Sequence, residues 1–145
     1  MENMGKEVYS YNSECLSCND RPILPIMGEL HFSRYPFLKC CQEAGIKVWL
    51  RIGPWAHGEC RNGGFPDWLV EKEKRGKLSL RTDDPQYLKY VDIFFTKIAE
   101  QADGYMHKDG GPVIGIQIEN EYGHVGGLQG PEGEAHIRTL TAMAK

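Results

Sequence analysis

The run IKVWLRI at residues 46–52 is almost entirely apolar and contains three β-branched side chains. This pattern is typical of a strand that is buried on both faces, as in a parallel sheet. PVIGIQIE at residues 112–119 has the same character, and PILPIMGEL at residues 22–30 predicts a third, shorter strand. Helical patterns separate the three runs, so we expect an α/β fold with a parallel sheet.

Helix signals lie between and after these strands. FLKCCQEAG at 37–45 follows Pro36 and ends on a glycine, which is typical of a short helix with a glycine cap. FPDWLVEKEKR at 65–75 predicts another short helix, and the Asp84-Pro85 pair predicts the start of a long one that ends near Ala102. The last predicted helix spans 133–145. The apolar stripe of the long helix consists of Leu88, Val91, Phe94, Phe95, Ile98 and Ala102.

Composition excludes several classes of protein. The 145 residues carry a net charge of −3 and include 41% hydrophobic residues, with no basic stripe for nucleic acid. No apolar run approaches the ~20 residues of a membrane span, and the stretch MENMGKEVYSYNSE lacks the apolar core of a secretory signal. The lone CxxC of Cys15 and Cys18 could be a redox pair or half of a zinc site, but no second ligand pair is present, which favours two small apolar residues near a turn. We therefore expect neither nucleic acid nor membrane as a partner, and the localisation stays open.

Polar clusters follow all three predicted strands, namely Gly28–His31, Arg51–Arg61 and Glu119–Tyr122. In parallel α/β folds the chemistry lies in loops at the carboxyl ends of the strands, so these clusters should converge. Three interpretations remain open: glycoside hydrolysis by two carboxyl groups, a divalent metal site, or solvated loop acids paired with Arg34, Arg51 and Arg61. The metal interpretation is the weakest because no HExxH motif is present, and no metal or organic cofactor is predicted. The candidate side chains are Glu29, Glu59, Glu119, Glu121, His31, His57, Asn120, Trp55 and Tyr122.

Glu119 and Glu121 are two residues apart. In an extended strand their side chains would point to the same side, and their mutual repulsion would raise one carboxyl pKa. A raised carboxyl pKa suits a general acid that protonates a leaving-group oxygen. The alternative is that one of the two carboxylates pairs with an arginine and both stay ionised.

Three blocks of the sequence resemble consecutive signature blocks of the family 35 glycoside hydrolases, the β-galactosidases. They are GELHFSRYP (28–36), RIGPWAHGECRNGGFPDWL (51–69) and GGPVIGIQIENEYG (110–123). The resemblance implies a (β/α)8 TIM barrel and a retaining mechanism that acts on terminal β-galactosyl groups. It also implies a galactoside or oligosaccharide substrate, and relatives that are often secreted or periplasmic.

The same resemblance implies roles for single residues. Glu121 resembles the general acid/base at the end of the fourth barrel strand, and Asn120 would hydrogen-bond the sugar 2-hydroxyl. Glu59 and the Gly58 backbone match positions that bind galactose hydroxyls. His57 falls where many members carry asparagine.

The chain departs from the family pattern in two places. GELHFSRYP runs directly into FLKCCQEAG, so the first helix and the second strand of the barrel are missing. A complete barrel takes ~250 residues, and the family's nucleophile, a glutamate on the seventh strand, would lie beyond Lys145. We therefore expect an N-terminal extension (1–21) and a partial catalytic domain (22–145) that covers about the first half of a barrel.

Such a partial domain has functional consequences. Without a nucleophile the chain alone should be inactive, and its exposed sheet edges favour self-association. The rival interpretation is a non-catalytic carbohydrate-binding module that keeps Glu59, Asn120 and Trp55 as a sugar platform.

Overall fold

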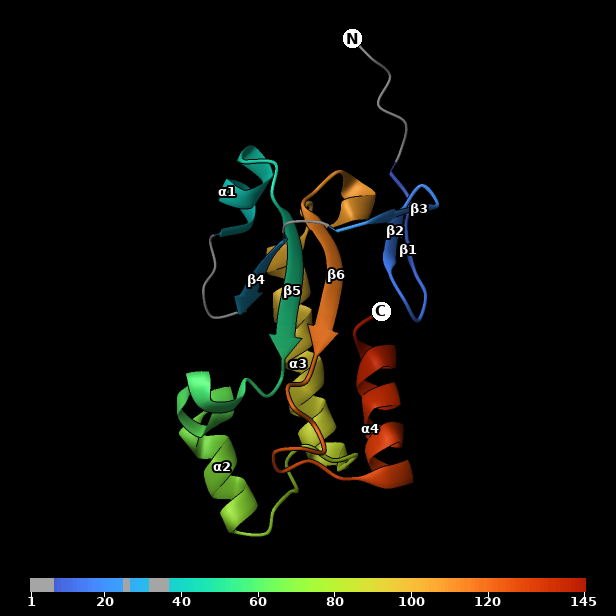
Figure 1. Cartoon of the computed structure of the whole chain (residues 1–145). Helices are drawn as coiled ribbons and strands as arrows, with labels where there is room; N and C mark the ends of the chain where they lie inside the picture. The colour runs from blue at the N-terminus through green and yellow to red at the C-terminus, as the bar shows by residue number, and fades with distance from the viewer. Residues whose placement is uncertain (1–6, 25–26, 32–36) are drawn as a thin grey trace.

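The described residues of the computed structural model form a mixed α/β fold with two small sheets (Figure 1). The structure describes residues 7–24, 27–31 and 37–145. The first sheet is antiparallel, with the order β1-β2-β3, and the second is parallel, with the order β4-β5-β6. The strands are β1 (Tyr9–Tyr11), β2 (Leu16–Cys18), β3 (Arg21–Ile23), β4 (Met27–His31), β5 (Lys47–Gly53) and β6 (Val113–Ile118).

The parallel sheet confirms the three predicted parallel strands, with one change at the first. The predicted strand 22–30 is divided between β3, which belongs to the antiparallel sheet, and β4, which belongs to the parallel one. β5 lies in the centre and pairs with β4 on one side and β6 on the other. Because the three strands run in the same direction, the loops after β5 and β6 leave from the same end of the sheet (Figure 1).

In the described part of the chain, four α-helices occupy the segments predicted to be helical, and the last begins at Gly130 rather than at Gly133. α3 begins one residue after Asp84, whose side chain accepts hydrogen bonds from the backbone N–H groups of Gln86 and Tyr87, as an N-cap residue does. Gly45, just after α1, adopts the left-handed conformation expected of a helix-terminating glycine. The helices are α1 (Phe37–Glu43), α2 (Asp67–Lys74), α3 (Pro85–Ala102) and α4 (Gly130–Met143), with the short 3₁₀ elements η2 (His57–Glu59), η3 (Arg61–Gly64) and η4 (His107–Asp109).

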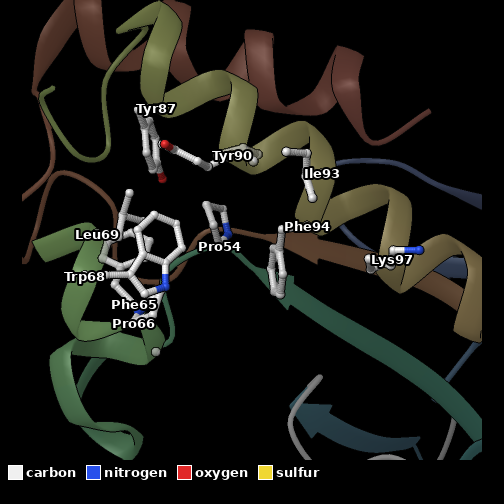
Figure 2. Close-up of a pocket in the computed structure, with 12 residues that line it drawn as sticks. Pro54, Phe65, Pro66, Trp68, Leu69, Tyr87, Tyr90, Ile93, Phe94 and Lys97 are labelled. Atoms are coloured by element: carbon white, nitrogen blue, oxygen red, sulfur yellow. The ribbon is translucent and has the colours of Figure 1, made fainter. Parts of the chain in front are cut away.

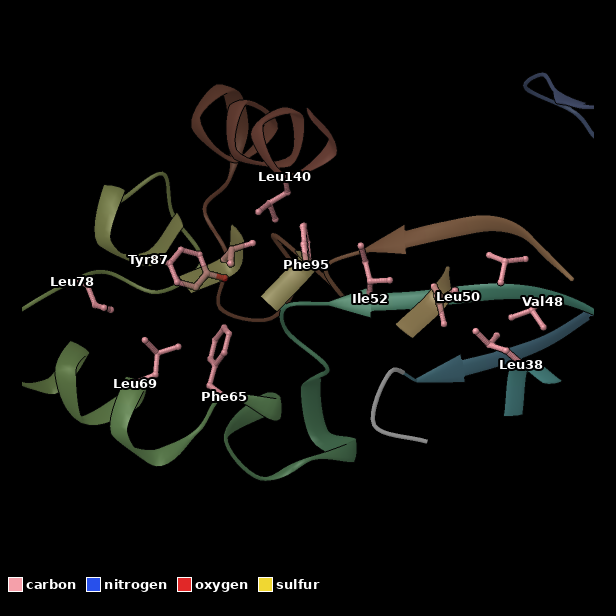
Figure 3. Packing of buried hydrophobic residues seen from close by; sticks show 13 residues of the cluster. Leu38, Val48, Leu50, Ile52, Phe65, Leu69, Leu78, Tyr87, Phe95 and Leu140 are labelled. Atoms are coloured by element: carbon pink, nitrogen blue, oxygen red, sulfur yellow. The ribbon is translucent and has the colours of Figure 1, made fainter. Parts of the chain in front are cut away.

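The hydrophobic core lies between the parallel sheet and the helices (Figure 3). Alternate residues of β5, namely Val48, Leu50 and Ile52, are buried together with Phe95 of α3 and Leu140 of α4. The residues between them on β5 are only half-buried. The prediction of a strand buried on both faces is therefore wrong for β5, because in the described part of the chain the helices of the core cover one face of the strand more fully than the other.

The antiparallel N-terminal sheet is attached to the rest by polar and aromatic contacts. Lys47 Nζ lies 2.9 Å from the Glu7 carboxylate, and the rings of Tyr9 and His107 meet edge to face at 4.9 Å. Cys15 and Cys18 are free thiols here, and the described residues contain no group of three side chains that could hold a metal ion. Among the described helices, none is both long and apolar enough to cross a membrane.

Candidate functional site

The ends of β5 and β6 are joined by a backbone hydrogen bond from Glu119 N–H to the Gly53 carbonyl, at 2.7 Å. Beyond this bond the chain leaves strand geometry, because Glu119 and Glu121 both adopt left-handed backbone angles, with φ of 57° and 47°. The expectation that the two carboxylates point to the same side of an extended strand is therefore wrong. β6 ends at Ile118, and each carboxylate has its own partner.

The partner of Glu119 is Arg81, in the loop between α2 and α3. Arg81 donates from Nε to Glu119 Oε1 at 3.2 Å and from Nη2 to Oε2 at 2.7 Å, a two-pronged ion pair. The two side chains are only 5% and 2% exposed. The structure thus shows one of the predicted alternatives, in which an arginine pairs with one of the two glutamates. The arginine itself, Arg81, was not among the predicted residues.

No pattern in the sequence pointed to Arg81. It precedes the paired glutamate by 38 residues and belongs to none of the polar clusters at the strand ends. Of the arginines proposed for this role, Arg61 pairs with Asp67 at 3.1 Å, and residue 34 lies outside the described residues. An ion pair between distant loops is visible only once the chain is folded.

Burial sets the protonation behaviour of Glu119. Removal of its carboxylate from water raises its pKa above the ordinary value, and the hydrogen bonds and charge of Arg81 oppose part of that rise. Burial is the largest cause of the shift. The raised pKa that we expected from two neighbouring carboxylates therefore exists at Glu119, but for a different physical reason.

Glu121 faces the loop that follows β5. Its Oε2 atom lies 3.4 Å from Nε2 of His57, and both side chains are partly open to solvent, at 47% and 37% exposure. The His57 ring stacks against Trp55, with 6.5 Å between ring centres and 16° between planes. The carboxyl ends of two adjacent parallel strands thus bring a solvent-accessible carboxylate and an imidazole together.

The other predicted site residues differ in accessibility. Asn120 is 7% exposed, and its side-chain amide donates to the Ala56 carbonyl at 3.5 Å. Gly58 is exposed, with open space where a Cβ would lie. Glu59 ends η2, but its side chain, like those of Glu29 and His31, lies outside what the structure describes.

A separate apolar pocket of about 280 Å³ lies between α2 and α3 (Figure 2). Its walls carry aromatic and aliphatic side chains, and none of Glu121, Asn120, His57 or Gly58 lines it. A sugar needs several convergent polar groups, so this pocket is a poor candidate for the glycan site. The labelled lining residues are Pro54, Phe65, Pro66, Trp68, Leu69, Tyr87, Tyr90, Ile93, Phe94 and Lys97.

The sequence of the chain is similar to those of known proteins. The sequence model of the glycosyl hydrolases family 35 matches residues 21–141. The chain is 42% identical over 109 residues to Beta-galactosidase 17 of Arabidopsis thaliana, a match that covers 75% of this chain and 15% of that protein. It is also 42% identical over 87 residues to the human Beta-galactosidase, covering 60% of this chain and 12% of the relative. The Beta-galactosidase of Xanthomonas manihotis matches at 36% identity, covering 68% of this chain and 17% of that protein.

Proposed function

The chain belongs to glycosyl hydrolase family 35, and we propose that it carries the acid/base half of a site that cleaves terminal β-galactosides by a retaining mechanism. Its enzyme class is that of a glycosidase, and a glycan is the substrate class. The chain spans only 12–17% of the length of the relatives described above, so the activity of a whole protein is part of the proposal.

The contact between Glu121 and His57 carries this proposal. A general acid/base must reach the glycosidic oxygen of a bound sugar, so its carboxyl group must be accessible to solvent. Glu121 meets this requirement and Glu119, buried against Arg81, does not. We therefore assign the proton transfer to Glu121: it donates a proton to the leaving oxygen and later takes one from the attacking water.

The remaining roles follow from the positions around Glu121. Asn120 hydrogen-bonds the sugar 2-hydroxyl, a contact that strengthens in the oxocarbenium-like transition state. Glu59 and the Gly58 backbone bind other galactose hydroxyls, and His57 adds one hydrogen bond. The open space at Gly58 and the exposure of His57 support an approach of the sugar from this side.

A retaining glycosidase also needs a nucleophilic carboxylate about 5–5.5 Å from the acid/base carboxyl group. We propose that residues 22–145 form part of a (β/α)8 barrel, preceded by the extension 1–21, and that the nucleophile is not among them. The three parallel strands and the meeting of Glu121 with His57 at their carboxyl ends are compatible with such a barrel segment. The 145-residue chain alone is then inactive.

A chromogenic β-galactoside tests this proposal, with Glu121→Gln as the matched variant. We expect no turnover by the 145-residue chain above the level of the variant. Turnover that the substitution abolishes would show that the chain holds a complete site and would refute the proposed inactivity.

The second candidate is a carbohydrate-binding module, which the same sample tests by galactose titration. Saturable binding without turnover would favour it. Trp55, the aromatic platform of that hypothesis, already contacts Arg81, His57 and Phe65 with its ring. This leaves less of the ring for a sugar and favours the half-site proposal.

A further inference from the structure

We propose that Arg81 is the positioning residue of this site: it holds both sides of the Glu121–His57 contact in place without touching the substrate. The proposal rests on the function proposed above, since the residues that it positions are the ones assigned to sugar cleavage. The side chain of Arg81 is 5% exposed, and its guanidinium is already hydrogen-bonded to Glu119, Asn120 and Val125, so we assign it no contact with the sugar. Its effect must therefore pass through neighbouring groups.

One half of this effect is on the segment that contains Glu121. Besides the Glu119 carboxylate, the guanidinium of Arg81 donates to the backbone carbonyl of Asn120 at 3.1 Å and to that of Val125. The planar fork of an arginine has five N–H donors in fixed directions, so one side chain can hold a carboxylate and two carbonyls at once. Arg81 thus holds segment 119–125 near both of its ends, with Glu121 between the held points.

This segment needs such support because of its backbone. Glu119 and Glu121 are in the left-handed region, which an L-residue with a side chain occupies only when surrounding contacts hold it there. A further hydrogen bond joins this segment to the loop that contains Arg81, since the Tyr122 hydroxyl donates to the Arg81 carbonyl at 2.8 Å. The direction in which Glu121 points therefore depends on contacts made by Arg81.

The other half of the effect is on His57. The guanidinium carbon of Arg81 lies 4.7 Å from the centre of the Trp55 ring and 5.2 Å from that of Tyr122. Trp55 in turn stacks on the His57 ring. A series of contacts therefore runs from His57 through Trp55 and Arg81 to Tyr122. Lysine cannot replace arginine here, because a point charge neither stacks on the rings nor reaches three acceptors.

Nuclear magnetic resonance of the whole 145-residue chain tests the proposal without any ligand. The ring signal of His57, identified by its loss in His57→Gln, reports the neighbouring carboxylate, and Glu121→Gln gives its position when that carboxylate is gone. We expect Arg81→Met and Arg81→Lys to move the His57 signal to the position seen in Glu121→Gln. The methyl signals of Val48 and Leu140, both fully buried, show whether the core is intact.

Arg75→Met is the matched control, since Arg75 pairs with Glu71 on the surface of α2 and should leave the His57 signal unchanged. Arg81→Lys keeps the positive charge opposite Glu119, so the His57 signal of this variant tests the proposal if Arg81→Met is unfolded. A wild-type His57 signal in a folded Arg81 variant, or in Glu121→Gln itself, would overturn the proposal. Unfolding of both Arg81 variants would overturn it too, because the arginine would then serve the fold as a whole.

Failure of the proposed function can be told apart from failure of this inference. The galactoside and galactose assays report the site's chemistry, whereas the His57 signal reports only geometry in the free chain. A chain that neither cleaves nor binds galactosides can still show the predicted shift in both Arg81 variants.

Discussion

Substitution of Gly63 by alanine should destabilise the chain strongly, because two unfavourable effects meet at this residue. Gly63 has a φ of +63°, where an L-residue costs about 1–2 kcal/mol more than glycine. An added Cβ would also lie 1.9, 2.0 and 2.3 Å from three atoms of the Trp55 ring. The ring would have to retreat by about 1.5 Å, and overpacking of this kind costs about 1–3 kcal/mol. We therefore expect a loss of about 2–5 kcal/mol in the free energy of unfolding.

Gly76→Ala separates the two effects. Gly76 has nearly the same φ, +64°, but an added Cβ there would have no atom within 4 Å, so only the backbone cost of about 1–2 kcal/mol applies. Both substitutions reduce the entropy of the unfolded chain equally, so that contribution cancels in the comparison. Urea unfolding followed by circular dichroism measures both variants. If Gly63→Ala proves no less stable than Gly76→Ala, the close packing of Trp55 against Gly63 is refuted.

Two further predictions concern charge and assembly. Arg81→Met should cost about 3–5 kcal/mol near neutral pH, because it leaves the Glu119 carboxylate buried without its cation. Burial raises the Glu119 pKa and Arg81 lowers it, so Glu119 in the folded variant takes up a proton at a higher pH than in the wild type. The difference in unfolding free energy between the two proteins should therefore shrink as the pH falls. Urea unfolding over a pH series measures it, and a constant difference would contradict the prediction. The described parallel sheet has β4 and β6 at its edges, where unpaired backbone groups can pair with another chain. We therefore expect self-association that increases with concentration. Sedimentation that shows one monomeric species at every concentration would rule it out.

Local patterns predicted the four helices well, but they did not predict β1 and β2, whose residues fall in the expected N-terminal extension 1–21. The long helix Pro85–Ala102 begins where the Asp84-Pro85 pair predicted, because an N-cap bond joins residues two or three positions apart. Gly45 ends α1 for a similar reason, since the left-handed conformation is a property of one residue. The predicted strand 22–30 failed as a single element, because its two halves pair with different sheets.

The candidate site shows the same difference between what local sequence patterns predict and what long-range contacts decide. The blocks around His57 and Glu121 were visible in the sequence, and parallel strands bring their ends together as expected. The different environments of Glu119 and Glu121 were not visible, because they depend on a left-handed turn after β6 and on an arginine in another loop. Nor could spacing show which face of β5 would be covered more fully.

The amino-acid sequence by itself therefore determined the family, the three parallel strands and the four helices that accompany them, and it suggested the residues of the proposed chemistry. Only the tertiary structure decided that Glu119 is a buried partner of Arg81 while Glu121 is free to meet His57 and solvent. The physical reason is distance along the chain. Caps, turns and strand patterns act over a few residues, whereas burial and ion pairing depend on groups that only folding brings together.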